Sequence, residues 1–427
     1  MNFDTLFGGI GRALSNRQFR RYWTANAIST IGRWIYRTAV GWMVWDLTKD
    51  PKWLGIVAFA DIFPMVVLSI VAGAISDRIG YLKVIRLSQL GMCLMGAAFA
   101  GAVFAGYLTI DLIIWISIIH GTIEAMSTPP RIAIVNALVK KEELSPAIAL
   151  NSAAFNAARV VGPAIGGVIL LWTDPGTVLA LATATFIPFY ILTLFLKVED
   201  AGGDGRISWE LIEDIKSGVV YAFRHTGIRF LMLMLMAVGL LIRPVMEFAP
   251  GFAAQVFGRG PEGYAMLLSS IGAGAMVAAL WLARRGRSEG LTSLVVSSLI
   301  VQSIALILFA FSGNIYVGSA FLATMGFFML VGNVGSQTLI QNTVAADMRA
   351  RAMSLFIMLS YGLPAVGALV IGWIASFAGL QPTIAAGAAL TLLIWLWARP
   401  QVARLAPVLE KADGGAEKPR YPAPGRP

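Results

Sequence analysis

Long apolar runs recur along the whole chain, each separated from the next by a short polar interruption or by Gly and Pro. A helix needs roughly 17–25 mostly apolar residues to cross about 30 Å of hydrocarbon, and twelve runs have that length. They cover residues 22–47, 53–76, 84–107, 110–135, 146–172, 177–196, 228–249, 263–283, 291–311, 315–341, 352–378 and 382–398. With 57% hydrophobic and 13% charged residues, the chain has more apolar surface than a soluble domain can bury. The sequence therefore predicts an all-α membrane protein with twelve transmembrane helices.

The basic residues predict how these helices are oriented. An even number of spans places both termini on one side. Most Lys and Arg residues fall in segments on that side, whereas the opposite loops hold only Lys49, Lys52 and Arg259. Because basic residues stay on the cytoplasmic side of short loops, we expect both termini in the cytoplasm and the protein in the cytoplasmic (inner) membrane. This asymmetry explains most of the net charge of +10, so no nucleic-acid partner is expected. A lone cysteine, Cys93, excludes a disulfide within the chain.

The longest polar interruption divides the spans into six and six. It begins at Lys197 with a flexible acidic stretch, and from Ser208 to Phe223 its apolar residues recur at helical spacing, which predicts an amphipathic helix on the membrane surface. The expected organisation is a six-helix half over 1–196, a linker over 197–227, a second six-helix half over 228–398 and a disordered cytoplasmic tail over 399–427.

An internal repeat supports two pseudo-symmetric halves. The stretch VNALVKKEELSPAIALN before the fifth run is similar to QNTVAADMRARAMSLF before the eleventh. Gly162 and Gly167 recur about 205 residues later as Gly367 and Gly372. Duplicated six-span units are a recurring transporter design.

Residues 73–80, GAISDRIG, join the second and third spans. Their glycine, Asp-Arg and glycine spacing resembles the loop signature of the major facilitator superfamily, with matches at Gly73, Asp77, Arg78 and Gly80. The resemblance implies a conformational latch in which Asp77 faces the N-terminal end of the eleventh span, near 351–354, where a carboxylate accepts free N–H groups. The bases expected directly after Gly80 arrive later, first at Lys83. The alternative is an ordinary basic loop.

A second motif, GPAIGG, lies in the fifth span. Gly162, Pro163, Gly166 and Gly167 resemble the antiporter motif of the same superfamily, and the alternative is generic close packing of helices. The first, fourth and fifth spans are similar to the enterobactin-exporter-like branch, also called transmembrane secretion effectors. The resemblance implies a secondary exporter with the twelve-helix major facilitator fold.

Polar side chains form stripes on the first, fourth, seventh and tenth spans. Because polar groups are costly against lipid, they predict the interior pathway. The predicted substrate cavity contains Asn26, Arg33, Arg37, Glu124, Arg243, Glu247, Asn333, Gln337 and Gln341.

Three titratable residues are candidates for proton coupling. Glu124 lies near mid-membrane, where burial favours a neutral carboxyl, and His120 lies one turn away. The alternative for Glu124 is a permanent pair with Arg33. Asp61 has the depth of Arg37, so it either pairs with Arg37 or carries a proton. Arg243 and Glu247 could pair across one turn.

The deep charges also bear on the cargo. Five arginines (33, 37, 131, 159 and 243) face three carboxylates (61, 124 and 247), which favours an anionic or amphiphilic molecule. We therefore expect a secondary active transporter, a proton-coupled exporter of a siderophore- or drug-like molecule working by alternating access. The alternatives are a lysophospholipid flippase or importer on the same fold, and a non-transporting membrane sensor.

The sequence contains no motif of a membrane enzyme or ATP-driven pump. It has no Walker loop, no H-E-x-x-H and no G-x-S-x-G. We expect a monomer that is not an enzyme and uses no cofactor or metal, and whose partners are the bilayer, protons and a small molecule.

Overall fold

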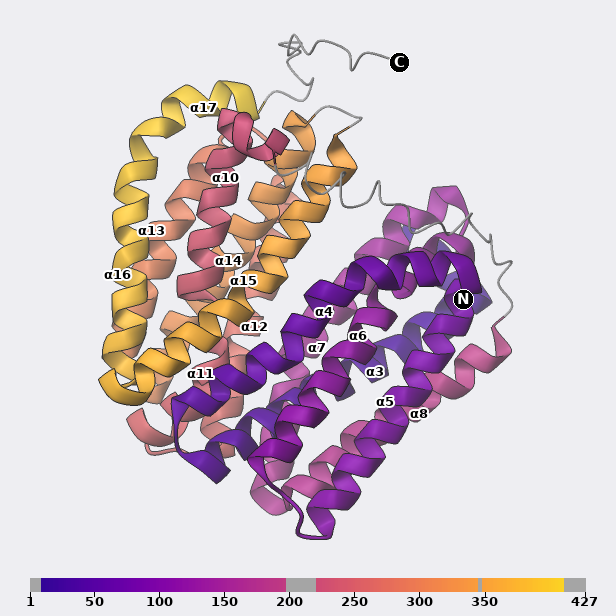
Figure 1. Cartoon of the computed structure of the whole chain (residues 1–427). Coiled ribbons are helices and arrows are strands. Elements are labelled where there is room, and N and C mark those ends of the chain that lie inside the picture. Colours follow the sequence, from indigo (N-terminus) through magenta and orange to yellow (C-terminus); the bar gives the residue numbers. More distant parts are fainter. Residues whose placement is uncertain (1–8, 197–219, 345–347, 411–427) are drawn as a thin grey trace, which may run out of the picture.

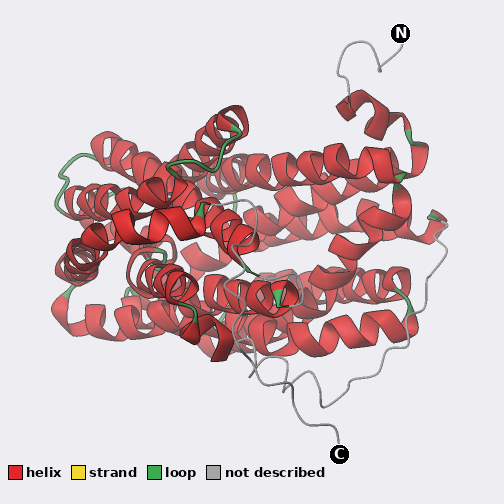
Figure 2. Ribbon diagram, turned by 90° about the horizontal axis from the view of Figure 1, so that it is seen from above, coloured by secondary structure: helices red, strands yellow, loops and turns green. Residues whose placement is uncertain are grey.

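The computed structural model describes residues 9–196, 220–344 and 348–410, and nearly all of them are helical (Figures 1 and 2). The N-terminal half consists of α2 (Gly9–Ser15), α3 (Arg17–Thr48), α4 (Pro51–Ile79), α5 (Tyr81–Phe104), α6 (Ile110–Leu138), the short η1 (Lys141–Glu143), α7 (Leu144–Trp172) and α8 (Pro175–Phe195). The C-terminal half consists of α10 (Thr226–Ala237), η2 (Val238–Ile242), α11 (Val245–Gly251), η3 (Phe252–Val256), α12 (Pro261–Arg285), α13 (Leu291–Ala310), α14 (Ile315–Thr343), α15 (Arg349–Ala378), α16 (Leu380–Ala398), η4 (Arg399–Gln401) and α17 (Val402–Leu409).

The helices confirm an all-α membrane fold and are consistent with twelve spans. Among the described residues, eleven helical segments are long and apolar enough to cross a membrane. The 32-residue α3 is not one of the eleven, although its length suffices. Its arginines at 33 and 37 lower its hydropathy, and these side chains belong to the site described below.

The seventh span differs from the single helix expected over 228–249. It runs as α10, the π-helix η2, α11 and the π-helix η3. Pro244 has no N–H to donate, and the preceding Arg243 donates its N–H to Val238 five residues back, at 2.9 Å. The wider turn displaces the chain around Arg243.

The C-terminal tail is helical where disorder was expected. Residues 399–409 form η4 and α17, and Glu410 then receives the N–H groups of Gly290 at 2.7 Å and Thr292 at 2.8 Å. This carboxylate caps the first turn of α13, which holds the end of α17 against the bundle. The rest of the predicted tail and the predicted amphipathic helix from Ser208 to Val219 lie outside the described residues.

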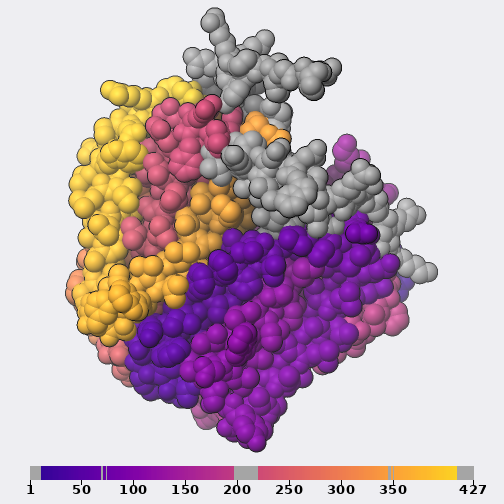
Figure 3. All heavy atoms as spheres, in the orientation of Figure 1, coloured from indigo at the N-terminus to yellow at the C-terminus, as the bar shows by residue number. Residues whose placement is uncertain are grey.

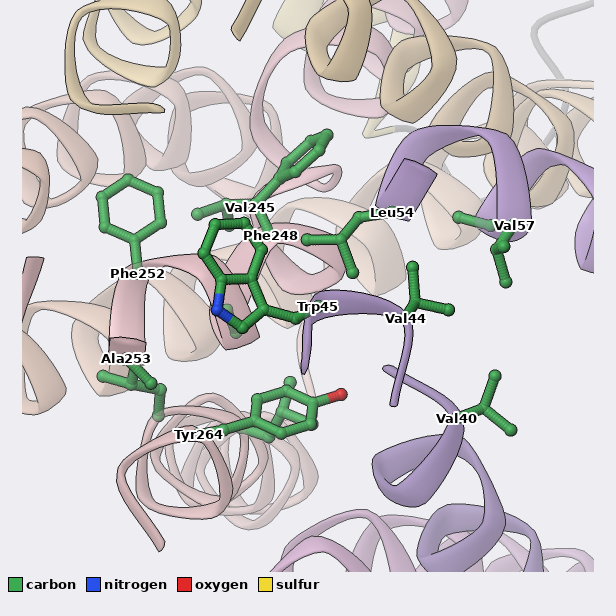
Figure 4. Close-up of a cluster of buried hydrophobic side chains, with 14 of the residues drawn as sticks. Val40, Val44, Trp45, Leu54, Val57, Val245, Phe248, Phe252, Ala253 and Tyr264 are labelled. Carbon is green, nitrogen blue, oxygen red and sulfur yellow. The ribbon is translucent and has the colours of Figure 1, made fainter. Parts of the chain in front are cut away.

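Among the residues that the structure describes, the buried core links the two halves at one end of the bundle only. We call the end that carries α2 and α17 the terminal end, and the opposite end, with the α5–α6 loop, the far end (Figure 1). At the far end one cluster joins both halves: Trp45 of α3 packs among Phe248, Phe252 and Tyr264 (Figure 4). At the terminal end the described residues form two separate clusters, one made only of residues 13–196 and one made only of residues 222–409.

Glycines bring the halves together at the far end. A Cβ on Gly55 of α4 would overlap the carbonyl of Ala368 on α15, and one on Gly372 would lie 2.8 Å from the carbonyl of Pro51. Such close approach of backbones is how small residues drive helix packing in membranes. Figure 3 shows α4 in contact with the orange α15 along this face.

The predicted repeat has matching contacts in the two halves. Gly162 of α7 packs on α3 and Gly167 packs on α12, whereas Gly367 of α15 packs on η2 and Gly372 packs on α4. The fifth span therefore contacts the first and eighth, and the eleventh contacts the seventh and second. This is the relation expected for a duplicated unit.

Candidate functional site

Among the residues that the structure describes, three ion pairs lie in the interior, and Asp61 and Glu247 have partners that differ from those expected. Arg33 pairs with Glu124 at 3.0 Å, as the alternative interpretation of Glu124 predicted. The predicted pair between Arg37 and Asp61 is wrong, because Asp61 pairs with His120 at 2.6 Å. The predicted pair between Arg243 and Glu247 is also wrong, because Glu247 binds Arg37 across the two halves.

A glycine explains why Asp61 meets His120. A Cβ on Gly121 would overlap the backbone carbonyl of Asp61, so α6 approaches α4 at this level more closely than a larger residue allows. The His120 ring stacks on Tyr36 of α3, with ring centroids 4.9 Å apart. Its Nδ1 faces the Asp61 carboxylate, and its Nε2 is buried without a partner among the described residues.

The Arg33–Glu124 pair lies beside the histidine. The Nη1 atom of Arg33 donates to both carboxylate oxygens, at 3.0 and 3.2 Å, and Nη2 donates to the Thr30 hydroxyl at 2.8 Å. The Glu124 side chain is only 12% exposed. An imidazole and two carboxylates at this depth form a group that can hold and release a proton.

Arg131 is a buried arginine with a neutral partner. It donates to the Gln89 side chain at 2.7 Å and lies 5.1 Å above the Phe189 ring. Tyr22 donates to its backbone carbonyl at 3.1 Å. The sequence did not assign a role to Gln89, although it is the only amide in the third run.

A cavity of about 70 Å³ lies in the C-terminal half, where α7 of the other half reaches it. Its polar lining comes from Arg159, Arg243, Ser298, Gln302, Asn333 and Ser336, and its apolar lining includes Met234, Leu235, Val238, Val295, Leu299, Met329 and Leu330. Arg243 and Asn333 were predicted cavity residues. Arg159 was noted only as a deep charge, and Gln302 was missed, although it is the single amide of the ninth run.

The remaining predicted cavity residues lie elsewhere. Asn26 is half-buried, and its Oδ1 has no partner among the described residues. Gln337 is half-buried and Gln341 is exposed near the terminal end of α14; neither is among the residues that line this cavity. A common role for the whole set stays a prediction.

The latch motif is placed at the terminal end of α4. Gly80 has a φ of 97°, which ends α4 and starts α5 at once and which favours glycine. Asp77 accepts a hydrogen bond from the Tyr81 hydroxyl at 2.7 Å. Within the described ranges, no ion pair includes Asp77, Arg78 or Lys83. Their latch function, and any role of Gly73, stays a prediction.

The GPAIGG motif packs between α3 and α12. Gly162 and Gly166 face the backbone of α3 around 31–35, with a Cβ on Gly166 placed 3.4 Å from the Cα of Ile35, and Gly167 faces Pro261 and Ala265 of α12. Pro163 is buried beside them. Close packing accounts for these contacts, and an antiporter role remains a prediction.

Comparisons with known proteins agree on one family. A family model described as transmembrane secretion effector matches residues 12–424. The staphyloferrin A transporter of Staphylococcus aureus is 26% identical over 374 residues, 85% of this chain and 90% of that protein. The multidrug efflux pump Tap of Mycolicibacterium fortuitum is 23% identical over 368 residues, 83% and 88% of the two chains.

Solved structures show the same fold at low identity. The nucleoside transporter NupG has a TM-score of 0.70 at 13% identity, over 90% of this chain and 98% of its own. A bacterial homologue of the human lysosomal transporter Spinster, described as inward-facing and unoccupied, has a TM-score of 0.65 at 15% identity, over 92% and 98%.

Proposed function

Because the chain belongs to the transmembrane secretion effector family of the major facilitator superfamily, we propose that it is a proton-coupled secondary transporter. It exports a small amphiphilic or anionic molecule by alternating access, and both termini lie in the cytoplasm. The observation that carries this proposal is the division of the core: among the described residues, the halves share one cluster at the far end and have separate clusters at the terminal end.

A divided core of this kind suits one state of an alternating-access cycle. Two rigid halves that rock about a central site separate at one face while they close at the other. The far end, sealed here by Trp45 and its neighbours, is the outer face, and the terminal end is open to the cytoplasm.

The proton site is the group formed by Asp61, His120 and Glu124. Each carboxylate has a partner, Asp61 the His120 imidazole and Glu124 the Arg33 guanidinium. A proton on Glu124 leaves Arg33 in the interior without a counter-charge, which is unfavourable. Protonation from outside therefore favours a rearranged state, and loss of the proton to the cytoplasm resets the site.

The test compares charge-neutral variants in proteoliposomes that contain a pH-sensitive dye. Probe-driven proton movement is recorded with citrate, ethidium and lysophosphatidylglycerol for the native chain, Asp61→Asn and Glu124→Gln. Asp111→Asn, an exposed carboxylate on the same helix as Glu124, is the matched control. We expect both buried variants to abolish proton movement and the control to retain it. Unchanged proton movement in both buried variants would contradict the assignment, and flux into the cytoplasmic side would make the chain an importer or flippase.

A further inference from the structure

We propose that the cavity between η2, α13 and α14 binds the head group of the cargo and that this head group is a hydroxycarboxylate. The inference rests on the proposed transport function and names the chemical class for this site. Its basis is a surplus of positive charge, a cross-half pair of arginines and an amide oxygen without a donor.

Of the three deep arginines that have no ion pair among the described residues, two line this cavity, and the third, Arg131, donates to Gln89 elsewhere. Of the three deep carboxylates, Glu124 is paired with Arg33, Glu247 with Arg37 and Asp61 with the His120 imidazole. In the part of the chain that the structure describes, Arg159 and Arg243 have no ion pair, and no carboxylate lines the cavity that they share. Two like charges at mid-membrane are costly unless an anion offsets them.

Each guanidinium is held in place by groups that do not neutralise it. Arg159 lies 5.9 Å from the Trp34 ring and 3.3 Å from the Met246 sulfur, and its Nε is buried without a partner among the described residues. Arg243 donates to the Ser360 carbonyl at 2.5 Å. The other N–H groups of a planar guanidinium are spaced to donate to both oxygens of a carboxylate.

The side chain of Gln302 indicates that the ligand carries a hydrogen-bond donor. This side chain is fully buried, and its amide nitrogen donates to the Ser298 carbonyl at 2.9 Å. Its Oε1 has no donor among the described residues. A buried amide oxygen is stabilised by a hydrogen bond, so the ligand that fits here carries a hydroxyl near its carboxylate.

The size of the cavity limits what it holds. A water occupies roughly 10–15 Å³ on this measure of volume, so about 70 Å³ accommodates a few polar heavy atoms. This room suits a carboxylate with an adjacent hydroxyl, which is a head group and not a whole drug-sized molecule.

The two arginines come from different halves of the protein, so a bound anion also affects how closely the halves approach. Arg159 comes from α7 of the N-terminal half, whereas Arg243 follows η2 in the C-terminal half. Their mutual repulsion opposes closer approach of the halves, and a bound carboxylate removes it. Cargo binding therefore favours closure of the terminal end.

Titration calorimetry on the purified full chain in detergent tests this directly. The probes are citrate, tricarballylate (which is citrate without its hydroxyl), tetraphenylphosphonium and lysophosphatidylglycerol. We expect citrate to bind at least about tenfold more tightly than tricarballylate, the size of effect that a lost hydrogen bond to a buried group produces. Gln302→Leu should remove that preference.

The arginines are tested by Arg159→Gln and Arg243→Gln, which should each weaken citrate binding at least about tenfold. Arg159→Lys and Arg243→Lys keep the charge but lose the two parallel N–H groups of the guanidinium. Citrate affinity should therefore fall only about threefold. Arg259→Gln, an exposed far-end arginine, is the matched control and should bind citrate as the native chain does.

Citrate affinity that is unchanged in both glutamine variants would overturn the proposal, as would binding of tetraphenylphosphonium alone. Arginine-dependent binding of lysophosphatidylglycerol alone would also overturn it, since the site would then serve a lipid head group. Because binding needs no translocation, citrate binding without flux would refute only the transport function, whereas flux with arginine-independent binding would refute only this inference.

Discussion

The ion pair between Arg37 and Glu247 should hold the far end closed. Breaking a fully buried pair costs about 3–5 kcal/mol, and breaking an exposed pair costs about 0–1 kcal/mol. The two side chains are 36% and 19% exposed, so we expect Glu247→Gln to cost about 1–2 kcal/mol. Because the pair joins the two halves, this free energy is lost only from the state in which the far end is closed. The ratio of molecules with an open far end to molecules with a closed one should therefore rise about 5- to 30-fold.

The ratio can be measured by double electron–electron resonance on purified protein. Spin labels at Tyr107 and Tyr316 report on the far end, because both residues are exposed and lie on opposite halves. They require Cys93→Ala, which removes the only native cysteine.

Three comparisons make the result decisive. Asp46→Asn removes an exposed pair with Lys49 inside one half and should leave the distances unchanged. The exchange Arg37→Glu with Glu247→Arg should restore the closed population. A distance distribution in Glu247→Gln that matches the native one would refute the claim that this pair closes the far end.

Three further results are expected from thermal unfolding in detergent. Gly121→Val should destabilise the protein, because the new side chain overlaps the carbonyl of Asp61; a melting temperature equal to that of the native chain would contradict the packing. Glu410→Ala should cost about 1 kcal/mol by uncapping α13, whereas Glu289→Ala, whose side chain is exposed, should change little. The Thr177 hydroxyl lowers the pKa of Asp174, so this cap of α8 stabilises the protein above about pH 4 and loses its effect as the pH falls through the lowered value. Asp174→Ala should therefore lower the melting temperature at pH 7 and make no difference below that range.

Apolar runs were enough to predict the helices, because burying a backbone in lipid leaves few other solutions. The apolar pattern could not predict how the seventh span is built. Pro244 and Pro250 are visible in the sequence, but they do not indicate that the chain on either side of α11 forms π-helical turns.

The pairing of charges was predictable only within limits. Equal depth correctly suggested Arg33 as a partner for Glu124, yet the same argument placed Arg37 with Asp61. Depth does not say how close two helices approach, and Gly121 decides that in favour of His120.

Contacts between the halves were the hardest to anticipate. Arg37 and Glu247 lie 210 residues apart, and they meet only because the far end is closed. Gln302 was missed, because its orientation toward the cavity depends on the rotation of α13 about its own axis.

The central claim is that this chain couples the movement of a small molecule to protons. Inside-out vesicles with an acidic lumen, carrying a fluorescent pH probe, test it most directly when citrate, ethidium or lysophosphatidylglycerol is added outside. Our account predicts that an anionic probe dissipates the gradient, and that Glu124→Gln vesicles do not respond. A gradient that no probe disturbs, in vesicles whose protein is shown to be folded, would contradict proton-coupled export.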